Sequence, residues 1–209
     1  MIKFEYIYLK YRDKIIFDNF SLNINRNEKI VITGKSGIGK SSLFHLLLGF
    51  VVPDRGRIYF ENREIDHKNI WEIRKNFAYV DQDVFIPDTT VKEYINFVFS
   101  IKQNHKLFNI EKLKSLFEHF EFDFNDIYNK STSKLSGGER QRIALIVAIM
   151  LNRKIFLLDE ATSALDSHLK NKVVNYFINQ KDKTVIAVSH DPQWLDNDII
   201  KKIDLEHLK

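Results

Sequence analysis

Residues 34–41 read Gly-Lys-Ser-Gly-Ile-Gly-Lys-Ser and lie between two apolar segments. Before them, residues 29–33 read Lys-Ile-Val-Ile-Thr, which is typical of a short buried strand, and residues 40–48 are rich in Leu and Phe, as in a helix. The eight residues match the pattern Gly-x-x-x-x-Gly-Lys-Ser/Thr, in which a glycine-rich loop surrounds phosphate groups with backbone amides. The strand, loop and helix together predict an α/β fold that binds a nucleoside triphosphate.

The residue types in this loop fit phosphate chemistry. Glycine adopts backbone conformations that a Cβ forbids, so neighbouring amides can converge on an anion, and the following helix adds the positive end of its dipole. We expect Lys40 to lie across the β- and γ-phosphates and the Ser41 hydroxyl to ligate Mg²⁺. The nucleotide-binding residues predicted here are Gly34, Lys35, Ser36, Gly37, Ile38, Gly39, Lys40, Ser41 and Ser42.

The composition narrows the possible functions. The 209 residues suit one α/β domain with an insertion, and the absence of cysteine excludes disulfides, thiolate metal sites and a cysteine nucleophile. The net charge is +4, with 32 basic and 28 acidic residues that are scattered along the chain, so nucleic acid is not an expected partner. No apolar run approaches the roughly 18 residues of a membrane span, and the N-terminus lacks a signal-peptide pattern, so we expect a soluble chain.

The hydrophobic pattern changes along the chain. Residues 2–24 alternate apolar and polar side chains, as in an antiparallel hairpin, and residues 56–60 continue that pattern. From 91 to 134 apolar residues recur at helical spacing, which predicts a helical lobe. Afterwards the apolar runs 155–158 and 184–188 are typical of buried parallel strands.

A second motif places two carboxylates at the end of a strand. Residues 154–160 read Lys-Ile-Phe-Leu-Leu-Asp-Glu, and ligands of open α/β sheets collect at the carboxyl ends of strands. Asp159 is expected to hold Mg²⁺, through water, and Glu160 to accept a proton from the water that attacks the γ-phosphate. Adjacent strand residues point to opposite faces, so we expect the two carboxylates to serve different partners.

A third motif, Leu-Ser-Gly-Gly-Glu-Arg-Gln at 135–141, opens the long apolar segment that follows. Ser136 and Glu139 form the Ser-x-x-Glu capping box of a helix N-terminus. Capping leaves the two intervening glycines unexplained, since glycine in a first turn costs up to about 1 kcal/mol relative to alanine. We expect a second phosphate-facing helix terminus here, with the Ser136 hydroxyl and the Gly138 amide as donors.

The order of these motifs resembles the ATP-binding subunit of ABC transporters over essentially the whole chain. The matching residues, in order, are the loop 34–41, Gln82 within 79–83, the signature 136–141, Asp159 with Glu160, Asp166 within 163–166, and His190 within 188–191. The resemblance implies a P-loop NTPase core with a mostly parallel sheet, an N-terminal antiparallel β subdomain and an inserted helical subdomain. It implies one domain over 1–209, in which 91–134 form the helical subdomain and 1–90 with 135–209 form the rest.

The resemblance also implies a role for each matching residue. Gln82 would sense Mg²⁺ and the attacking water, and His190 would contact the γ-phosphate. Tyr11 matches the aromatic residue that stacks on adenine, with Tyr8 as the rival, and either could be an ordinary hairpin aromatic. The catalytic residues implied are Glu160, His190 and Gln82, and the residues implied to hold Mg²⁺ are Ser41, Gln82 and Asp159.

The implied partners are a second ATPase and a membrane protein. A second copy, or a closely related subunit, would pair head to tail, with Ser136, Gly137, Gly138, Glu139 and Asp166 acting on the ATP of the other copy. Residues 129–134 lack the Thr-Glu-Val-Gly-like segment of many fused exporters, which favours a separate transmembrane permease. That permease would hold the cytoplasmic ATPase on the inner face of the cell membrane.

The sequence leaves alternatives for the site of permease contact and for the function of the protein. Members of the family dock their membrane partner near residues 83–90, where Phe85, Ile86 and Pro87 either form an apolar floor or pack between lobes. Alternatives to transport are an ABC ATPase that regulates a membrane partner, as at the divisome, or one that acts on DNA or in translation.

Overall fold

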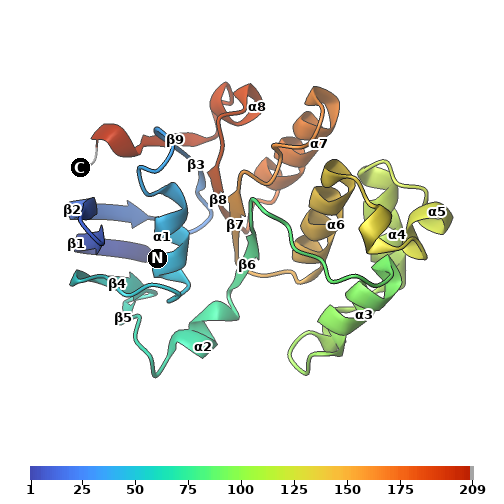
Figure 1. Cartoon of the computed structure of the whole chain (residues 1–209), viewed down its shortest axis with the longest axis horizontal. Coiled ribbons are helices and arrows are strands. Elements are labelled where there is room, and N and C mark those ends of the chain that lie inside the picture. The colour runs from blue at the N-terminus through green and yellow to red at the C-terminus, as the bar shows by residue number, and fades with distance from the viewer. Residues whose placement is uncertain (208–209) are drawn as a thin grey trace.

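The computed structural model describes residues 1–207 and combines two β-sheets with a helical lobe (Figure 1). The N-terminal sheet is antiparallel, with strand order β2-β1-β4-β5. Its strands are β1 (Ile2–Tyr11), β2 (Lys14–Ile24), β4 (Arg55–Phe60) and β5 (Arg63–Glu64). The register pairs Tyr11 with Lys14, which confirms the hairpin predicted for 2–24.

The second sheet is parallel, with strand order β6-β7-β8-β3-β9. Its strands are β3 (Lys29–Thr33), β6 (Phe77–Val80), β7 (Ile155–Asp159), β8 (Thr184–Val188) and β9 (Lys201–Asp204). The apolar runs at 29–33, 155–158 and 184–188 therefore form strands, as predicted. The parallel sheet with its antiparallel companion confirms the predicted fold class.

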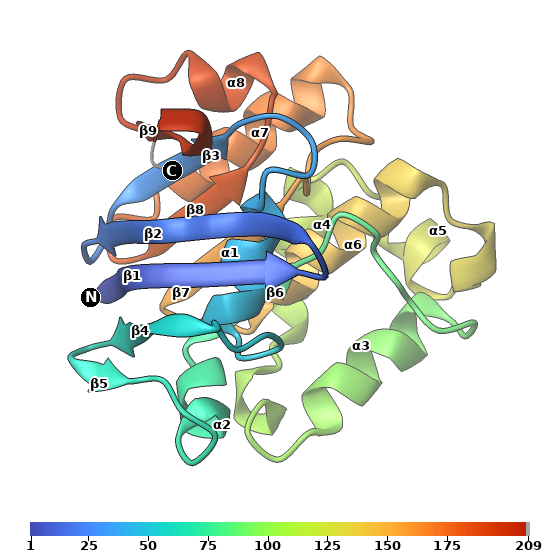
Figure 2. The same cartoon turned by 60° about the vertical axis from the view of Figure 1, so that its left-hand side comes forward.

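Both faces of the central strands β3, β7 and β8 are buried, which explains why these strands are apolar without alternation, whereas the edge strand β9 reads Lys-Lys-Ile-Asp and is partly exposed. On β3, Ile30 and Ile32 pack into the core shared with the antiparallel sheet, whereas Val31 packs into the core on the opposite face. Helix α1 (Lys40–Leu47) lies between the two sheets (Figure 2). The phosphate loop is thus held between a buried strand and a buried helix.

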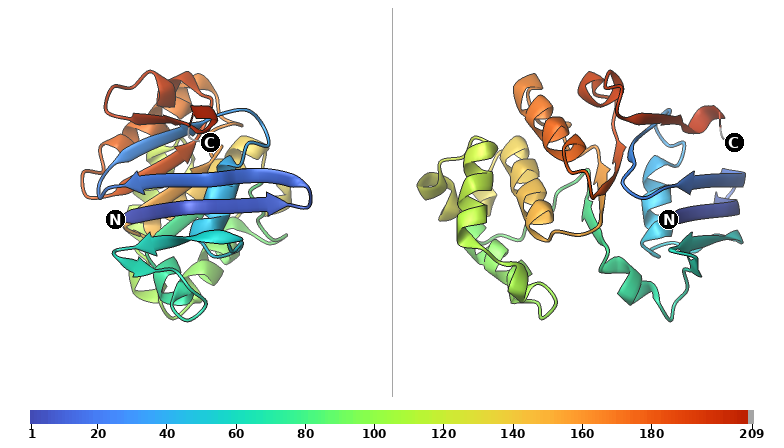
Figure 3. Two further views of the ribbon diagram at one scale, coloured as in Figure 1. Left: turned by 90° about the vertical axis from the view of Figure 1, so that its left-hand side faces the viewer. Right: turned by 180° about the vertical axis from the view of Figure 1, so that it is seen from behind.

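The helical lobe covers the end of the molecule opposite the antiparallel sheet (Figure 3). It contains α3 (Val91–Ser100), η1 (His105–Leu107), α4 (Ile110–His119), α5 (Phe124–Tyr128) and η2 (Thr132–Lys134). Leu113, Phe117 and Phe120 are fully buried, whereas Ile110, the first residue of α4, is 36% exposed. One apolar core joins this lobe to the sheet, and the division at 91 and 134 remains a sequence-based prediction.

The remaining helices follow β5, the helical lobe and the strands β7, β8 and β9. They are α2 (Ile70–Arg74), α6 (Gly137–Met150), α7 (Ser167–Ile178), α8 (Pro192–Leu195) and η3 (Leu205–His207). Most side chains in the second half of α6 are buried, as expected for its apolar sequence. Within residues 1–207, no helix is both long enough and apolar enough to cross a bilayer.

Candidate nucleotide site

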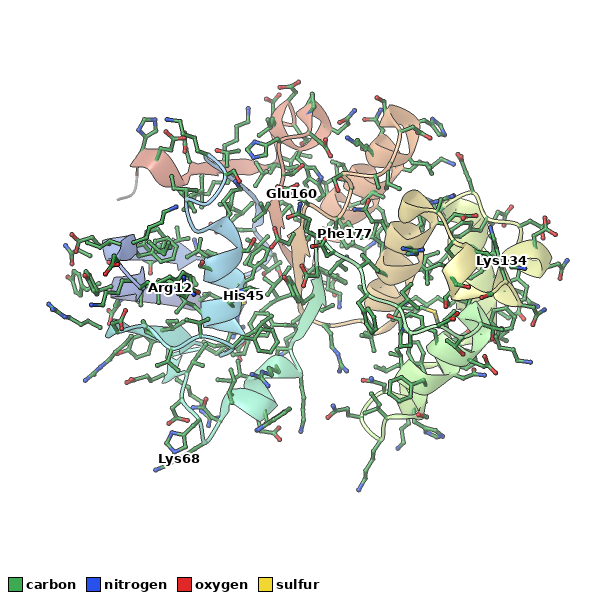
Figure 4. The ribbon with its side chains drawn as sticks, viewed as in Figure 1. Arg12, His45, Lys68, Lys134, Glu160 and Phe177 are labelled. Carbon is green, nitrogen blue, oxygen red and sulfur yellow. The ribbon has the colours of Figure 1, made fainter. Side chains whose placement is uncertain are left out.

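The parallel sheet brings the separate motifs to one edge. Strand β8 pairs with β7 on one side and with β3 on the other, so Glu160, His190 and the phosphate loop leave neighbouring strands at their carboxyl ends. Strand β6 pairs with β7, which places the segment of Gln82 at the same edge. Glu160 lies near the middle of the molecule, between Arg12 at the hairpin tip and Lys134 in the helical lobe (Figure 4).

The glycines of the phosphate loop have backbone conformations that other residues rarely adopt. Gly37 and Gly39 have φ angles of 71° and 118°. A Cβ on Gly39 would lie 2.6 Å from the Cγ2 atom of Ile16 on β2, so strand packing also requires glycine there. The loop is therefore a cradle of bare backbone, which suits a phosphate group.

Lys40 already lies inside this loop. Its ammonium donates hydrogen bonds to the carbonyl oxygens of Gly34, at 2.7 Å, and of Lys35, at 3.2 Å, and only 8% of the residue is exposed. These carbonyls hold a buried positive charge at the centre of the loop. The arrangement can neutralise part of a triphosphate's charge.

Ser41 and Asp159 meet beside the loop. Burial raises the pKa of Asp159, the nearby Ser41 hydroxyl opposes this shift, and Asp81 and Glu160 raise the pKa further by charge repulsion. Asp159 is only 2% exposed. A hydroxyl and a buried carboxylate close together are oxygen ligands of the type that Mg²⁺ binds, so the two residues fit a magnesium ion.

Glu160 lies one residue beyond β7, so strand alternation does not set the orientation of its side chain relative to that of Asp159. The argument from strand alternation was wrong, because β7 ends at Asp159 and Glu160 has a left-handed φ of 44°. Its backbone N–H donates to the carbonyl of Val188 at 2.9 Å. The backbone turn at the end of β7, held to β8, therefore separates Glu160 from the buried Asp159.

Gln82 and His190 are both exposed. Gln82 lines a cavity of about 430 Å³ whose other walls include Phe85, Gly137, Arg140 and Ala164. It therefore lies beside the start of α6 and the loop after β7 of its own chain. His190 follows β8 after the buried Ser189.

The capping box predicted for α6 is confirmed. The Glu139 N–H donates to the Ser136 hydroxyl at 3.2 Å, and the Ser136 N–H donates to the Glu139 carboxylate at 2.7 Å. Burial raises the pKa of Glu139, but its hydrogen bonds with Lys130 and Ser136 outweigh burial and leave the pKa lowered. Glu139 is thus bound within its own chain, whereas Ser136 is exposed and its hydroxyl proton can be donated.

The two glycines of the signature have different surroundings. A Cβ on Gly138 would lie 2.8 Å from the carbonyl oxygen of Ala164, whereas one on Gly137 would lie 3.7 Å from the nearest atom outside its helix, the Ala164 Cβ. Packing within the chain is therefore sufficient reason for Gly138. The exposed Gly137 has no such contact.

The hairpin tip lies beside the phosphate loop. Lys14 Nζ donates to the Gly37 carbonyl at 2.9 Å, and Tyr11, its partner in the hairpin, is 42% exposed. The ring of Tyr8 instead faces the guanidinium of Arg55, whose Cζ atom is 5.2 Å from the ring centroid. This placement favours Tyr11 over Tyr8 as the aromatic residue nearer the loop.

The sequence did not indicate several polar contacts. Asp166 is the N-cap of α7 and accepts from the Leu169 N–H at 2.9 Å. Gln141, only 4% exposed, donates to Ser163 Oγ at 2.9 Å and accepts from the Ala164 N–H at 2.9 Å. Gln141 belongs to the signature, but its partners lie about 20 residues away, so sequence spacing could not identify them.

Comparison with known proteins decides the family. The sequence pattern of the family described as ABC transporter matches residues 17–163. The chain belongs to the ABC transporter family. Together with the P-loop fold, membership makes it an ABC ATPase domain, as the sequence predicted.

Curated relatives of this ABC ATPase domain are longer proteins. A Rickettsia typhi protein whose name describes an export ATP-binding/permease protein is 38% identical over 180 residues, which cover 84% of this chain and 31% of the relative. The ATP-dependent lipid A-core flippase of Neisseria meningitidis is 35% identical over 196 residues, covering 90% of this chain and 31% of the flippase. The chain thus spans about a third of each.

Solved structures share the fold. A bacterial Atm1-family ABC exporter with ATP bound has a TM-score of 0.84 and 26% identity, covering 98% of this chain and 37% of the exporter chain. A dimeric ATP-binding cassette in a post-hydrolysis state, bound to ADP and Pi, has a TM-score of 0.76 and 28% identity, covering 91% of this chain and 88% of that one.

Proposed function

We propose that this ABC ATPase binds two Mg-ATP between two chains paired head to tail, and that hydrolysis drives transport through a transmembrane permease. The observation that carries the proposal is the buried ammonium of Lys40, which the carbonyls of Gly34 and Lys35 hold inside the phosphate loop, at the sheet edge from which Glu160 and His190 leave. This arrangement supplies cation ligands, phosphate donors and a candidate base within one site.

Each residue of the site has a proposed role. Lys40 and the backbone amides of residues 34–42 bind the phosphates, and Tyr11 stacks on adenine. Ser41, Gln82 and Asp159 hold Mg²⁺, which neutralises charge on the phosphates when bound. Glu160 accepts the proton of the attacking water and His190 donates to the γ-phosphate.

The second chain would complete the site. Ser136 and Gly137 are exposed in the single chain, so the N-terminus of α6 is accessible to the ATP of a second copy or of a closely related ATPase subunit. We propose that Ser136, Gly137 and Gly138 act there, with Glu139 supporting them through the cap and Asp166 at the dimer seam. The dimeric cassette with ADP and Pi, to which this chain is similar, supports this arrangement.

We further propose that the permease is a separate polypeptide that holds this ATPase on the cytoplasmic face of the membrane. The support is the sequence of residues 129–134, which differs from that of many fused exporters. A candidate contact is Phe85, which is 84% exposed and so does not pack between the lobes. The Rickettsia typhi relative, in contrast, is named for both ATP-binding and permease parts.

The separate permease can be tested by tagging this chain at its native locus. We expect the tagged chain to co-purify from detergent extracts with a distinct multi-span protein that separates from it on a denaturing gel. A single tagged polypeptide that contains the membrane spans would contradict the separate subunit.

The proposed roles of Glu160 in hydrolysis and of Ser136 in dimerisation can be tested with two variants. Glu160→Gln removes the base but keeps the size of the side chain, so we expect Mg-ATP to bind and the ATP-bound dimer to accumulate on a sizing column, with hydrolysis lost. Ser136→Arg fills the position that faces the other chain, so we expect loss of ATP-dependent dimers with ATP binding retained. Normal turnover in the first variant, or normal dimers in the second, would contradict the assigned roles.

A further inference from the structure

The residue that follows His190 is anchored through both of its carboxylate oxygens. Asp191 accepts a hydrogen bond from the Thr162 hydroxyl at 2.7 Å on one oxygen, and the ammonium of Lys170 lies 2.6 Å from the other. Its backbone N–H donates to Ser189 Oγ at 3.0 Å. The loop that carries His190 is therefore tied to two other segments by one side chain.

These segments carry other residues of the nucleotide site. Thr162 follows Glu160 by two positions and is 1% exposed, and its hydroxyl also accepts from Trp194 Nε1 at 3.4 Å. Lys170 lies in the first turns of α7, and its backbone N–H donates to the carbonyl of Asp166 at 2.9 Å. Asp191 thus joins the loop after β7, the loop after β8 and the start of α7.

The charges in this cluster are largely removed from water. The Lys170 and Asp191 side chains are 18% and 17% exposed. In the part of the chain that the structure describes, Lys170 is the ionic partner of Asp191. A carboxylate shielded from water is strongly disfavoured without a counter-charge, so loss of the lysine would displace the loop toward solvent.

The Asp191 carboxylate binds Thr162 and Lys170 even though its position in the chain would allow it to cap a helix. Asp191 is the N-cap residue of α8, where a carboxylate usually accepts from the backbone N–H groups of the first turn. Its side chain makes no such cap hydrogen bond. Both oxygens face Thr162 and Lys170 instead, which keeps the His190 loop against the loop after Glu160.

We infer that Lys170 is a positioning residue for ATP hydrolysis, which acts through Asp191 and Thr162 to hold His190 in register with Glu160. This inference rests on the proposed roles of His190 and Glu160. Because Lys170 contacts neither the phosphate loop nor Tyr11, its loss should change the chemical step and leave nucleotide binding unchanged. Small displacements of a catalytic group are sufficient for a large loss of rate.

The test is Lys170→Met, which keeps an unbranched side chain of similar length and removes its charge. We expect kcat for ATP to fall about tenfold, with KM and the equilibrium affinity for ATP within about twofold of wild type. Lys170→Arg restores the charge and should recover most of kcat. The turnover rate is expressed per nucleotide-binding site, so that any unfolded fraction does not count.

The matched control is Lys172→Met. Lys172 lies on the same helix and also has an ion pair of 2.6 Å, but with Glu121 in the turn between α4 and α5 of the helical lobe, far along the chain from His190. We expect its kcat to stay within about twofold of wild type, since the ion pair it loses is partly exposed. An equal loss in both variants would show that any ion pair on α7 has this effect and would overturn the inference.

A second variant tests the same inference if Lys170→Met does not fold. Thr162→Val removes the hydroxyl that binds Asp191 and leaves the charge pair in place, and we expect the same pattern of lower kcat with unchanged ATP affinity. Loss of ATP affinity in parallel with kcat would show a purely structural role and overturn the inference. His190→Ala distinguishes failure of the proposed function from failure of this inference. If His190→Ala keeps wild-type turnover, the proposed role of His190 is wrong. If His190→Ala is inactive while Lys170→Met and Thr162→Val are fully active, only the positioning role is refuted.

Discussion

The ammonium of Lys14 donates a hydrogen bond of 2.9 Å to the backbone carbonyl of Gly37, and this contact joins the β1–β2 hairpin to the phosphate loop. Gly37 has a left-handed φ of 71°, and a Cβ there would lie 3.3 Å from Lys14 Nζ. Lys14 makes no ion pair within residues 1–207. A positive charge outside the loop motif therefore lies next to the loop that would hold the triphosphate.

Lys14→Met should weaken ATP binding. Removing an exposed charge near the phosphates should raise the dissociation constant about threefold, which corresponds to roughly 0.6 kcal/mol. Equilibrium binding of ATP at low and high salt checks this, and the difference should shrink at high salt because exposed charges are screened. Lys10→Met, which removes an exposed charge from β1, is the control and should bind ATP as wild type does. Equal affinities in both variants would contradict the prediction.

Gly39→Ala should disrupt the phosphate loop. The new Cβ would lie 2.6 Å from Ile16 Cγ2 and 3.0 Å from Phe17 Cζ at a φ of 118°. Strain of this kind costs on the order of 1–3 kcal/mol, so we expect a lower melting temperature together with loss of ATP binding. Thermal denaturation and nucleotide binding measure the two effects. A variant that binds ATP normally would show that the β2 strand moves away without cost.

The two glycines of the signature should respond differently to alanine. Gly138→Ala places a Cβ 2.8 Å from the Ala164 carbonyl and should lower the melting temperature by about 2–4 °C, as a loss of roughly 1 kcal/mol does in a chain of this size. Gly137→Ala places a Cβ at an ordinary packing distance of 3.7 Å from the Ala164 Cβ, and alanine is favoured in a helix by up to about 1 kcal/mol, so its melting temperature should stay equal or rise. Both are measured without nucleotide, and equal melting temperatures would contradict the packing argument.

The N-terminus of α3 should lose stability in acid. Hydrogen bonds from the Thr89 hydroxyl, and then from the Thr90 N–H and hydroxyl, lower the pKa of Glu93 to about 2 from an ordinary value of 4.5. Because the folded pKa is the lower one, this stabilisation is present above pH 4.5 and is lost as the pH falls toward about 2. Glu93→Gln should therefore unfold at a lower temperature than wild type at neutral pH, and the difference should disappear near pH 2.

The control for this pH dependence is Glu118→Gln, which makes the same charge change at an exposed position on α4. Its melting temperature should follow that of wild type across the pH series. A constant difference between Glu93→Gln and wild type at every pH would show that the carboxylate's ionisation does not support the cap.

Much of the fold could be predicted because its signals are local. The run at 29–33 coincides with β3, since a strand buried on both faces needs consecutive apolar residues. Ser136 and Glu139 indicated a helix start because the cap joins residues only three positions apart. The phosphate loop, too, is contiguous, so the prediction that Gly34 to Ser42 bind nucleotide could be made from spacing alone.

The sequence by itself determined the class of site, because each motif carries its chemistry in adjacent residues. Only the tertiary structure decided how those motifs meet: the strand order places β8 between β7 and β3, and so brings Glu160, His190 and the loop to one edge. The tertiary structure also packs Gly138 against the Ala164 carbonyl and places the Asp191 carboxylate in contact with Lys170 and Thr162. Such contacts join residues 20 or more positions apart. Their partners are chosen by packing and burial, which residue type and local spacing do not encode.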